Sequence, residues 1–263
     1  MQTKTIISFL AGCSALALSS QAARAESARD IMDKVANTRK LEGSEAVIKM
    51  TLIDEKGKKR EREIAAATKL FDKGKTEKRV FRFLSPSDVK GTGFLVFDYE
   101  AKADDAWFYM PAFRKTRRIL SSDTSKPFMG SEFTFGDLSP SAIDDYTYTM
   151  GKEESCTGGT CYVIEAKPKS KAADGYSKQT YYVNKSNYVP VKILYYGSNG
   201  KLLKEMIASK IKLLDKKNKR YRSLRNEMIN KVNGRKSIFE FTKMTFSPKV
   251  KDDYFTQSFI ERG

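Results

Sequence analysis

The stretch EAVIKMTLIDEKGKKREREIAAA, residues 45–67, shows the pattern that most of the chain repeats. Apolar residues at every second position, Ala46 to Leu52, alternate with polar ones, which is the period of a strand with one buried face. Asp54 to Gly57 has the composition of a turn, and a charged segment, residues 59–67, follows it. The stretch therefore predicts an antiparallel hairpin.

Strand-like segments with the same alternation continue toward the end of the chain. The last two are joined at Asn233-Gly234, a dipeptide typical of tight hairpins. After the first hairpin, strands are expected at residues 75–84, 93–99, 105–110, 145–150, 161–167, 179–184, 191–196, 203–213, 225–232 and 235–246. About eleven strands at short spacing predict a mainly β protein, either a single antiparallel sheet that curls on itself or a sandwich.

One short helix is expected before the strands, over residues 27–39, because Ile31, Met32 and Val35 are spaced to share one face. Low hydropathy for so many strands indicates that one face of the sheet is wet. The other face must then be covered by helices or by a ligand. No linker rich in proline or serine divides the strands, so we expect one domain over residues 26–263.

Residues 1–25 have the order of a secretory signal: a positive charge by Lys4, an apolar run of small residues, and Ala23-Arg24-Ala25 as the cleavage pattern. The apolar run is too short for a membrane span, although a buried N-terminal helix is an alternative. We expect export to the periplasm or a similar compartment, with cleavage between Ala25 and Glu26. We expect no membrane span after that point.

A second processing signal lies inside the first, because Leu10-Ala11-Gly12-Cys13 has the form of a lipoprotein box. Cleavage there would leave only about six apolar residues upstream, at the lower edge of a usable signal. Cleavage before Glu26 is therefore favoured over lipidation of Cys13.

The net charge of +17 suggests an acidic partner: nucleic acid, a phospholipid surface or an anionic ligand. Export argues against nucleic acid. The densest basic run, residues 216–222, favours a solvated loop or a strand edge over a binding site.

Cys156 and Cys161 flank a four-residue connection with two glycines, which suits a hairpin turn that sets the cysteines across from each other. In an oxidising compartment they are expected to form a disulfide. A redox pair usually has two intervening residues, and a metal site would need more ligands than two thiols.

The sequence contains no histidine, which excludes catalytic triads and zinc-protease motifs. The acidic doublets at Asp104-Asp105, Asp144-Asp145 and Asp252-Asp253 cannot form facing pairs on a strand, and turn chemistry explains them better. Gly91 and Gly93 lack the rest of a phosphate-binding loop. We therefore expect no enzymatic activity, no metal and no cofactor.

Two segments break the alternation. Residues 106–111 are apolar on both faces and are followed by a basic cluster, and residues 126–133 form an apolar loop with proline and glycine. Aromatic rings beside guanidinium groups suit a lipid or another amphiphile. A doubly buried strand followed by an exposed basic turn explains the first segment equally well.

Four segments resemble the outer-membrane lipoprotein-sorting family, the LolA-like group: Pro86–Leu95, Asp105–Ile119, Phe128–Phe133 and Phe255–Arg262. The resemblance implies a single unclosed antiparallel β-barrel whose concave apolar face is covered by short helices and holds acyl chains. It also implies a periplasmic lipid or lipoprotein carrier without enzymatic activity that serves an inner-membrane exporter of the resistance-nodulation-division type. We expect a monomer with at most peripheral membrane contact.

The resemblance also yields candidate site residues. The nominated acyl contacts are Phe94, Trp107, Tyr109, Phe128 and Met129. The nominated headgroup or partner contacts are Arg114, Arg117 and Arg118. The loop at residues 128–133 is the candidate lid. The rival hypothesis is an adaptor or scaffold that docks to an exporter or envelope polymer through its basic face and carries no lipid.

Overall fold

The computed structural model describes residues 26–262 except residue 101, residues 140–142 and residues 171–174. The predicted signal peptide, including Cys13, lies outside the described residues, as does Ala25 at the predicted cleavage point.

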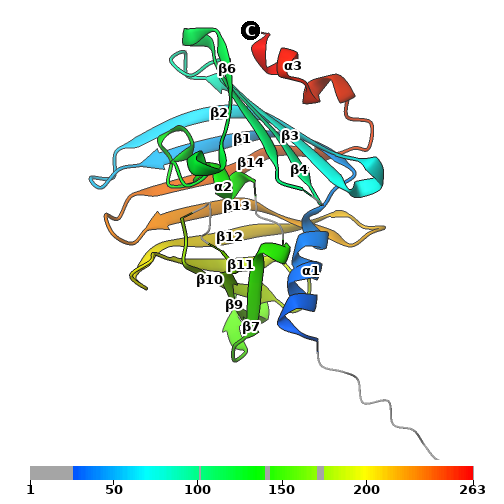
Figure 1. Cartoon of the computed structure of the whole chain (residues 1–263), viewed down its shortest axis with the longest axis vertical. Helices are drawn as coiled ribbons and strands as arrows, with labels where there is room; N and C mark the ends of the chain where they lie inside the picture. The colour runs from blue at the N-terminus through cyan, green and yellow to red at the C-terminus, as the bar shows by residue number, and fades with distance from the viewer. Residues whose placement is uncertain (1–25, 101, 140–142, 171–174, 263) are drawn as a thin grey trace, which may run out of the picture.

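Among these residues, fourteen strands form one antiparallel sheet that curves without closing (Figure 1). In chain order they are β1 (Gly43–Ile53), β2 (Lys59–Phe71), β3 (Thr76–Ser85), β4 (Gly93–Tyr99), β5 (Asp105–Met110), β6 (Lys115–Arg118), β7 (Tyr146–Met150), β8 (Glu154–Cys156), β9 (Gly159–Pro168), β10 (Lys178–Asn184), β11 (Pro190–Tyr196), β12 (Leu202–Asp215), β13 (Arg220–Asn230) and β14 (Lys236–Phe246). The order across the sheet is β6-β5-β4-β3-β2-β1-β14-β13-β12-β11-β10-β9-β7, with β8 paired to β9.

The predicted fold class, a mainly β half-barrel with short helices, is confirmed. The first hairpin pairs Ile48 with Ile64 through a turn in which Gly57 has a φ of 82°. The last hairpin turns at Gly234, as predicted. The expected number of strands was too low because β6 and β8 are short and carry no apolar alternation.

In the described part of the chain, three α-helices lie on the faces of the sheet: α1 (Ala28–Arg39), α2 (Phe135–Leu138) and α3 (Gln257–Glu261). Short 3₁₀ turns are η1 (Asp72–Gly74), η2 (Pro111–Phe113), η3 (Ser121–Asp123), η4 (Phe128–Gly130), η5 (Ile143–Asp145) and η6 (Asp252–Phe255). None of the described helices is long and apolar enough to span a membrane.

The predicted N-terminal helix is α1, and hydrogen bonds hold both of its ends. Ser27 and Asp30 form a reciprocal capping box at its start. At its other end Arg220, the first residue of β13, donates to the Asn37 carbonyl at 2.6 Å. Buried Ile31 on this helix belongs to the same apolar cluster as Ile164 of β9. The helix therefore covers the concave side of the later strands, with its C-terminal end at the start of β13.

The outer face of the sheet has a cover of its own over β2 to β5. There η6 and α3 pack on the sheet, and Ile260 is fully buried. A Cβ on Gly93 of β4 would lie 2.6 Å from the Ile260 side chain, so this glycine lets the C-terminal segment approach closely. The C-terminal segment therefore contributes to this outer cluster.

The predicted disulfide between Cys156 and Cys161 is present. The register differs from the expectation of facing cysteines, because Cys156 pairs with Gly159 and Cys161 pairs with Glu154. Thr157 and Gly158 form the turn, with Gly158 at a φ of 86°, so the bond runs diagonally across the two strands.

Replacing both cysteines, Cys156→Ala with Cys161→Ala, should lower stability only modestly. The closed loop is short, so its entropic contribution is about 2 kcal/mol. For a chain of this size we expect the thermal midpoint to fall by roughly 4–8 °C. A melting curve of the oxidised wild type against the double variant measures this. Failure of the variant to fold would show that the disulfide matters far more than chain entropy allows.

Candidate functional site

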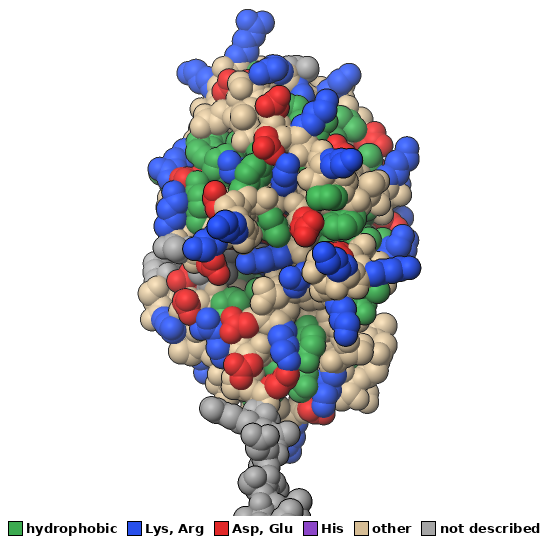
Figure 2. Space-filling view, turned by 90° about the vertical axis from the view of Figure 1, so that its right-hand side faces the viewer, with side chains coloured by type: hydrophobic (Ala, Val, Ile, Leu, Met, Phe, Trp, Pro, Cys, Tyr) green, Lys and Arg blue, Asp and Glu red, His purple; other side chains and the backbone are tan. Residues whose placement is uncertain are grey.

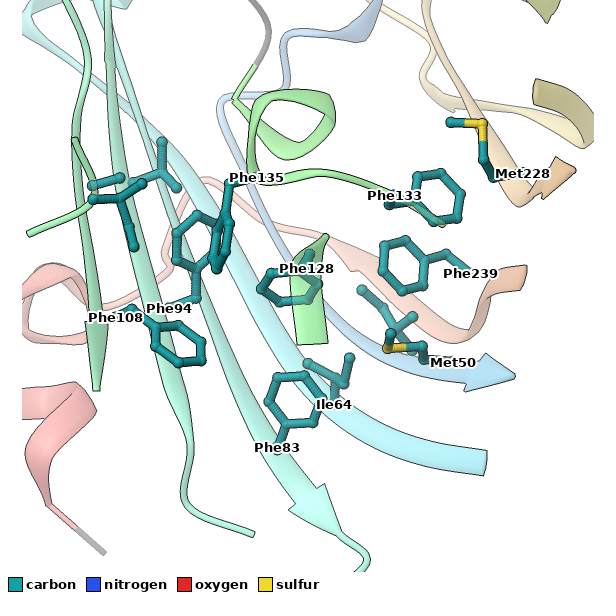
Figure 3. Packing of buried hydrophobic residues seen from close by; sticks show 14 of the residues in the cluster. Met50, Ile64, Phe83, Phe94, Phe108, Phe128, Phe133, Phe135, Met228 and Phe239 are labelled. Carbon is teal, nitrogen blue, oxygen red and sulfur yellow. The ribbon is translucent and has the colours of Figure 1, made fainter. Parts of the chain in front are cut away.

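A segment of the chain, residues 126–138, lies across the concave face, and we refer to it as the lid segment. Three of its rings, Phe128, Phe133 and Phe135, point into the apolar cluster of the sheet (Figure 3). Phe128 lies 5.4 Å from the ring of Phe94 on β4, and Phe133 stacks at 4.5 Å on Phe239 of β14. The lid segment therefore fills the part of the hollow that lies over β1 to β5 and β14.

Polar contacts hold the lid segment at Glu132, a buried acid at its centre. Its carboxylate accepts from the Asn230 amide at 2.8 Å and pairs with Arg235 at 3.2 Å. Its backbone N–H donates to the Ser237 hydroxyl, and its carbonyl accepts from the Lys204 ammonium at 2.7 Å. All four partners lie on or next to β12 to β14, so one residue ties the lid segment to the later strands.

Beside the filled region the concave face keeps a cavity of about 370 Å³. Its walls come from α1, from the lid segment and from strands on both sides of the sheet centre. Representative apolar lining residues are Val35, Phe81, Leu138, Met206, Met228 and Phe241. The volume is at the lower end of the range for small-molecule sites, and the lining is mostly apolar, as is usual for them.

One end of this cavity is charged. On β3 the residues Glu77, Arg79 and Phe81 follow one another at every second position and all line the cavity. Arg79 donates to Glu77 at 2.7 Å and to Asp98, and its other nitrogen donates to the Leu138 carbonyl of the lid segment at 2.9 Å. The ion pair therefore also positions the lid segment.

Two more arginines reach the same end. Arg39 is the last residue of α1, and Arg222 lies two residues into β13, with its guanidinium 3.7 Å from Glu77. Although burial disfavours the charge on Glu77, Arg79 and Arg222 hold its pKa at about 2. Burial lowers the pKa of Arg222 to about 10, and it also lowers the pKa of Arg39, helped by the charge of Arg79. Positive charge at this end is thus only partly compensated.

The structure does not bring the five nominated acyl contacts together. Phe94 and Phe128 are on the concave side but are 0% and 1% exposed, packed in the protein's own cluster, with Met129 beside them. Trp107 and Tyr109 point to the outer face, where Trp107 meets Phe97 at 5.0 Å. The physical reason is the strand period, since Phe94 and Trp107 occupy positions of opposite phase on paired strands.

The nominated headgroup contacts lie at the edge of the sheet, on and before β6, and do not line the cavity. Arg118 pairs with Asp105, and Arg117 is 3.9 Å from Asp123. Arg114 is exposed in a left-handed backbone conformation. These residues form an exposed basic hairpin.

Four charged residues that matter to the cavity were missed from the sequence: Arg39, Glu77, Arg79 and Arg222. Arg222 belongs to the basic run that was predicted to be solvated. The turn residues 216–219 of that run are indeed mostly exposed, but Arg222 points inward. The strand period could have identified Glu77 and Arg79. Both are an even number of positions from buried Phe83, so they point to the same face of β3.

A family model described as "Uncharacterized protein" matches residues 75–262. No curated protein matches the chain. Among solved structures, a domain from Vibrio parahaemolyticus named for outer membrane lipoprotein sorting has 29% identity and a TM-score of 0.81, over 89% of this chain and 98% of its own.

Two further solved structures resemble the chain. A DUF1329 family protein from Desulfovibrio piger has 26% identity and a TM-score of 0.81, over 88% of this chain and 96% of its own. A LolA superfamily protein from Nitrosomonas europaea has 20% identity and a TM-score of 0.68, over 89% of this chain and 100% of its own, which is a likeness of fold alone. These neighbours confirm the resemblance found in the sequence.

Glu77→Gln should destabilise the chain by about 3 kcal/mol at neutral pH, because it removes the buried carboxylate that pairs with both Arg79 and Arg222. The pKa of Glu77 is about 2 in the folded chain, below its usual 4.5, so its stabilisation is complete above that usual value. It is lost as the pH falls toward 2. The gap between wild type and variant should therefore narrow from pH 5 to pH 2.

Chemical denaturation at several pH values measures this gap, with Glu63→Gln on an exposed position of β2 as the matched control. A gap that stays constant down to pH 2 would contradict the assigned ion pair.

Proposed function

The chain belongs to the family of uncharacterized proteins whose model matches residues 75–262, and we propose that it is a periplasmic carrier of lipid or lipoprotein acyl chains without enzymatic activity. The observation that carries this proposal is the apolar cavity of about 370 Å³ between the concave face, α1 and the lid segment. The signal-like N-terminus and the neighbour named for lipoprotein sorting support the same assignment.

Binding would be driven by removing a hydrocarbon chain from water. Each buried methylene contributes about 0.8 kcal/mol, so a sixteen-carbon chain could gain roughly 10 kcal/mol before ordering costs. The walls offered by Phe81, Met206 and Met228 are apolar and flexible enough to fit a tail of variable shape. Such a site recognises hydrocarbon rather than a particular lipid.

The position of the lid segment would determine how large a ligand the cavity can hold. Phe128 packs between Phe94 and Phe83, so the nominated contacts Phe94 and Phe128 can meet a ligand only after the lid segment moves outward. Its aromatic rings occupy space on the inner face that a ligand could take. Their displacement would extend the cavity over β1 to β5. Two hydrogen bonds hold the segment in its present position: Glu132 accepts from Asn230, and the Leu138 carbonyl accepts from Arg79.

Docking to an exporter is the second part of the proposal. The exposed basic hairpin with Arg114, Arg117 and Arg118 stands at the sheet edge, away from the cavity, where a partner can reach it. On the face shown in Figure 2, Lys and Arg side chains are instead spread widely, with acidic and hydrophobic groups between them. The adaptor hypothesis shares this hairpin and differs in having no acyl cargo.

Cargo should remain with protein purified from its own host without delipidation, and native mass spectrometry should show an added acyl-containing mass. Ala36→Phe, on the cavity side of α1, should reduce that occupancy. If the ring displaces about two methylenes of the ligand, affinity falls by about 1.6 kcal/mol, roughly tenfold.

The matched control is Ala65→Phe, which adds the same ring at a half-buried position of β2 outside the cavity. Protein recovered wholly free of ligand would refute the carrier and favour the adaptor. Equal occupancy in both variants would place the cargo elsewhere on the chain.

Glu132→Ala should loosen the lid segment while leaving the sheet intact, because it removes the acceptor of Asn230 and Arg235. Losing hydrogen bonds to a buried charge costs about 1–3 kcal/mol, so the Phe128 amide, bonded to the Phe133 carbonyl at 2.7 Å, should exchange roughly 10- to 100-fold faster. Hydrogen–deuterium exchange measures this.

The control is Glu205→Ala, which removes an ion pair with Lys231 outside the lid segment. Equal protection of the Phe128 amide in both variants would rule out Glu132 as an anchor of the lid segment.

A further inference from the structure

The charged end of the cavity contains buried polar atoms without hydrogen-bond partners in the described part of the chain: Glu77 Oε1, which faces Arg222 at 3.7 Å, and two guanidinium nitrogens. The Nε atoms of Arg39 and Arg222 are buried, and neither has a hydrogen-bond partner among the described residues. Both side chains line the cavity. A guanidinium with an unused buried N–H is costly unless an acceptor meets it, and a buried charge costs still more.

The charges that line the cavity also leave an excess of positive charge. They are three arginines, Arg39, Arg79 and Arg222, against two acids, Glu77 and Asp137. Arg79 is committed to Glu77, Asp98 and the lid carbonyl. Asp137 accepts from the Thr134 N–H at 2.8 Å and from the Tyr176 hydroxyl at 3.3 Å. Arg222 has only its 3.7 Å ion pair with Glu77, and Arg39 has no ion pair among the described residues, so these two arginines are the least compensated.

Topology places these two arginines at one end of the apolar walls. Strands β3 and β13 are separated by β2, β1 and β14, and four antiparallel steps make them run in the same direction. Arg79 and Arg222 lie near the starts of their strands, and the cavity-lining residues Phe81 and Met228 lie farther along them. The cavity thus runs from a cationic end to an apolar end.

Small side chains leave space next to the arginines. Between β3 and β13 the inner positions of β1 and β2 carry Ser44, Ala46 and Ala66, and a recess of about 50 Å³ lies among them, lined also by Arg79 and Arg222. This recess extends the cationic end toward the middle of the sheet. The carboxylate of Glu77 lies beside one terminal nitrogen of Arg222 at 3.7 Å, and the Nε atom of Arg222 stays buried without a hydrogen-bond partner among the described residues.

We propose that Arg39 and Arg222 bind the anionic head of a single-chain amphiphile, a carboxylate or a phosphate monoester, whose hydrocarbon tail lies along the apolar walls. The inference rests on the proposed carrier function and assigns to it a class of ligand. Oxyanions accept paired N–H groups from guanidinium, which supplies the missing acceptors. Their charge offsets the burial that lowers the pKa of both arginines.

The test compares ligands that share one tail. Calorimetric titration of the delipidated full chain with hexadecanoate, hexadecyl phosphate and hexadecanol should show the two anions binding at least tenfold more tightly than the alcohol. This comparison uses only the wild type, so it does not depend on any variant folding. Inorganic phosphate alone should bind at least a hundredfold more weakly than hexadecyl phosphate.

Arg39→Met and Arg222→Met should each reduce the preference for the anions about tenfold or more while hexadecanol binds as before. Arg60→Met, at an exposed position of β2, should leave the preference intact. Retained hexadecanol binding shows that a variant is folded.

Three outcomes overturn the inference. Equal affinity of the wild type for hexadecanoate and hexadecanol refutes the anion site but remains consistent with the proposed carrier function. No binding of any sixteen-carbon ligand refutes both. Inorganic phosphate that binds as tightly as hexadecyl phosphate shows a site for free anions with no role for the tail.

Discussion

An open sheet has two faces that must be covered separately, and this constraint governs the whole molecule. Successive side chains of a strand point to opposite faces, so every strand supplies two sets of residues with different tasks. The outer set over β2 to β5 is covered by the C-terminal segment, where Ile260 packs on Gly93. The inner set is covered by α1 and the lid segment. Because β6 and β7 do not meet, the inner face stays accessible to a molecule other than the protein.

The alternation made the fold predictable. Residues 45–67, the Asn233-Gly234 turn and the helix that begins after Ser27 follow from local periods and turn chemistry, and all lie where the sequence places them. The disulfide was predictable from spacing and compartment, although its diagonal register was not. Short β6, Lys-Thr-Arg-Arg, carries no apolar signal, so only its partner β5 defines it as a strand.

The site was less predictable because it depends on which face each residue takes and on pairing between distant strands. Composition groups Trp107 with Phe94 as aromatic residues, whereas the register puts them on opposite faces. Arg222 was masked by its neighbours in a basic run, and its inward position follows only from the pairing of β13. Glu77 and Arg222 lie 145 positions apart in sequence order, and only the central strands β1, β2 and β14 connect them.

A charged end in an apolar hollow is unfavourable for stability alone, since well-packed apolar residues often stabilise a core as well as a buried ion pair does. The partial compensation of Arg39 and Arg222 increases this cost further. The part of the concave face filled by Phe94, Phe128 and Phe135 shows that the chain can close such a hollow with its own rings. That a cavity remains beside it and carries the cationic end therefore argues for a ligand that completes it. A carrier must also release that ligand, and Arg79 bonds both to Glu77 and to the Leu138 carbonyl of the lid segment. Movement of the lid segment and the electrostatics of the cationic end are thus linked through a single side chain.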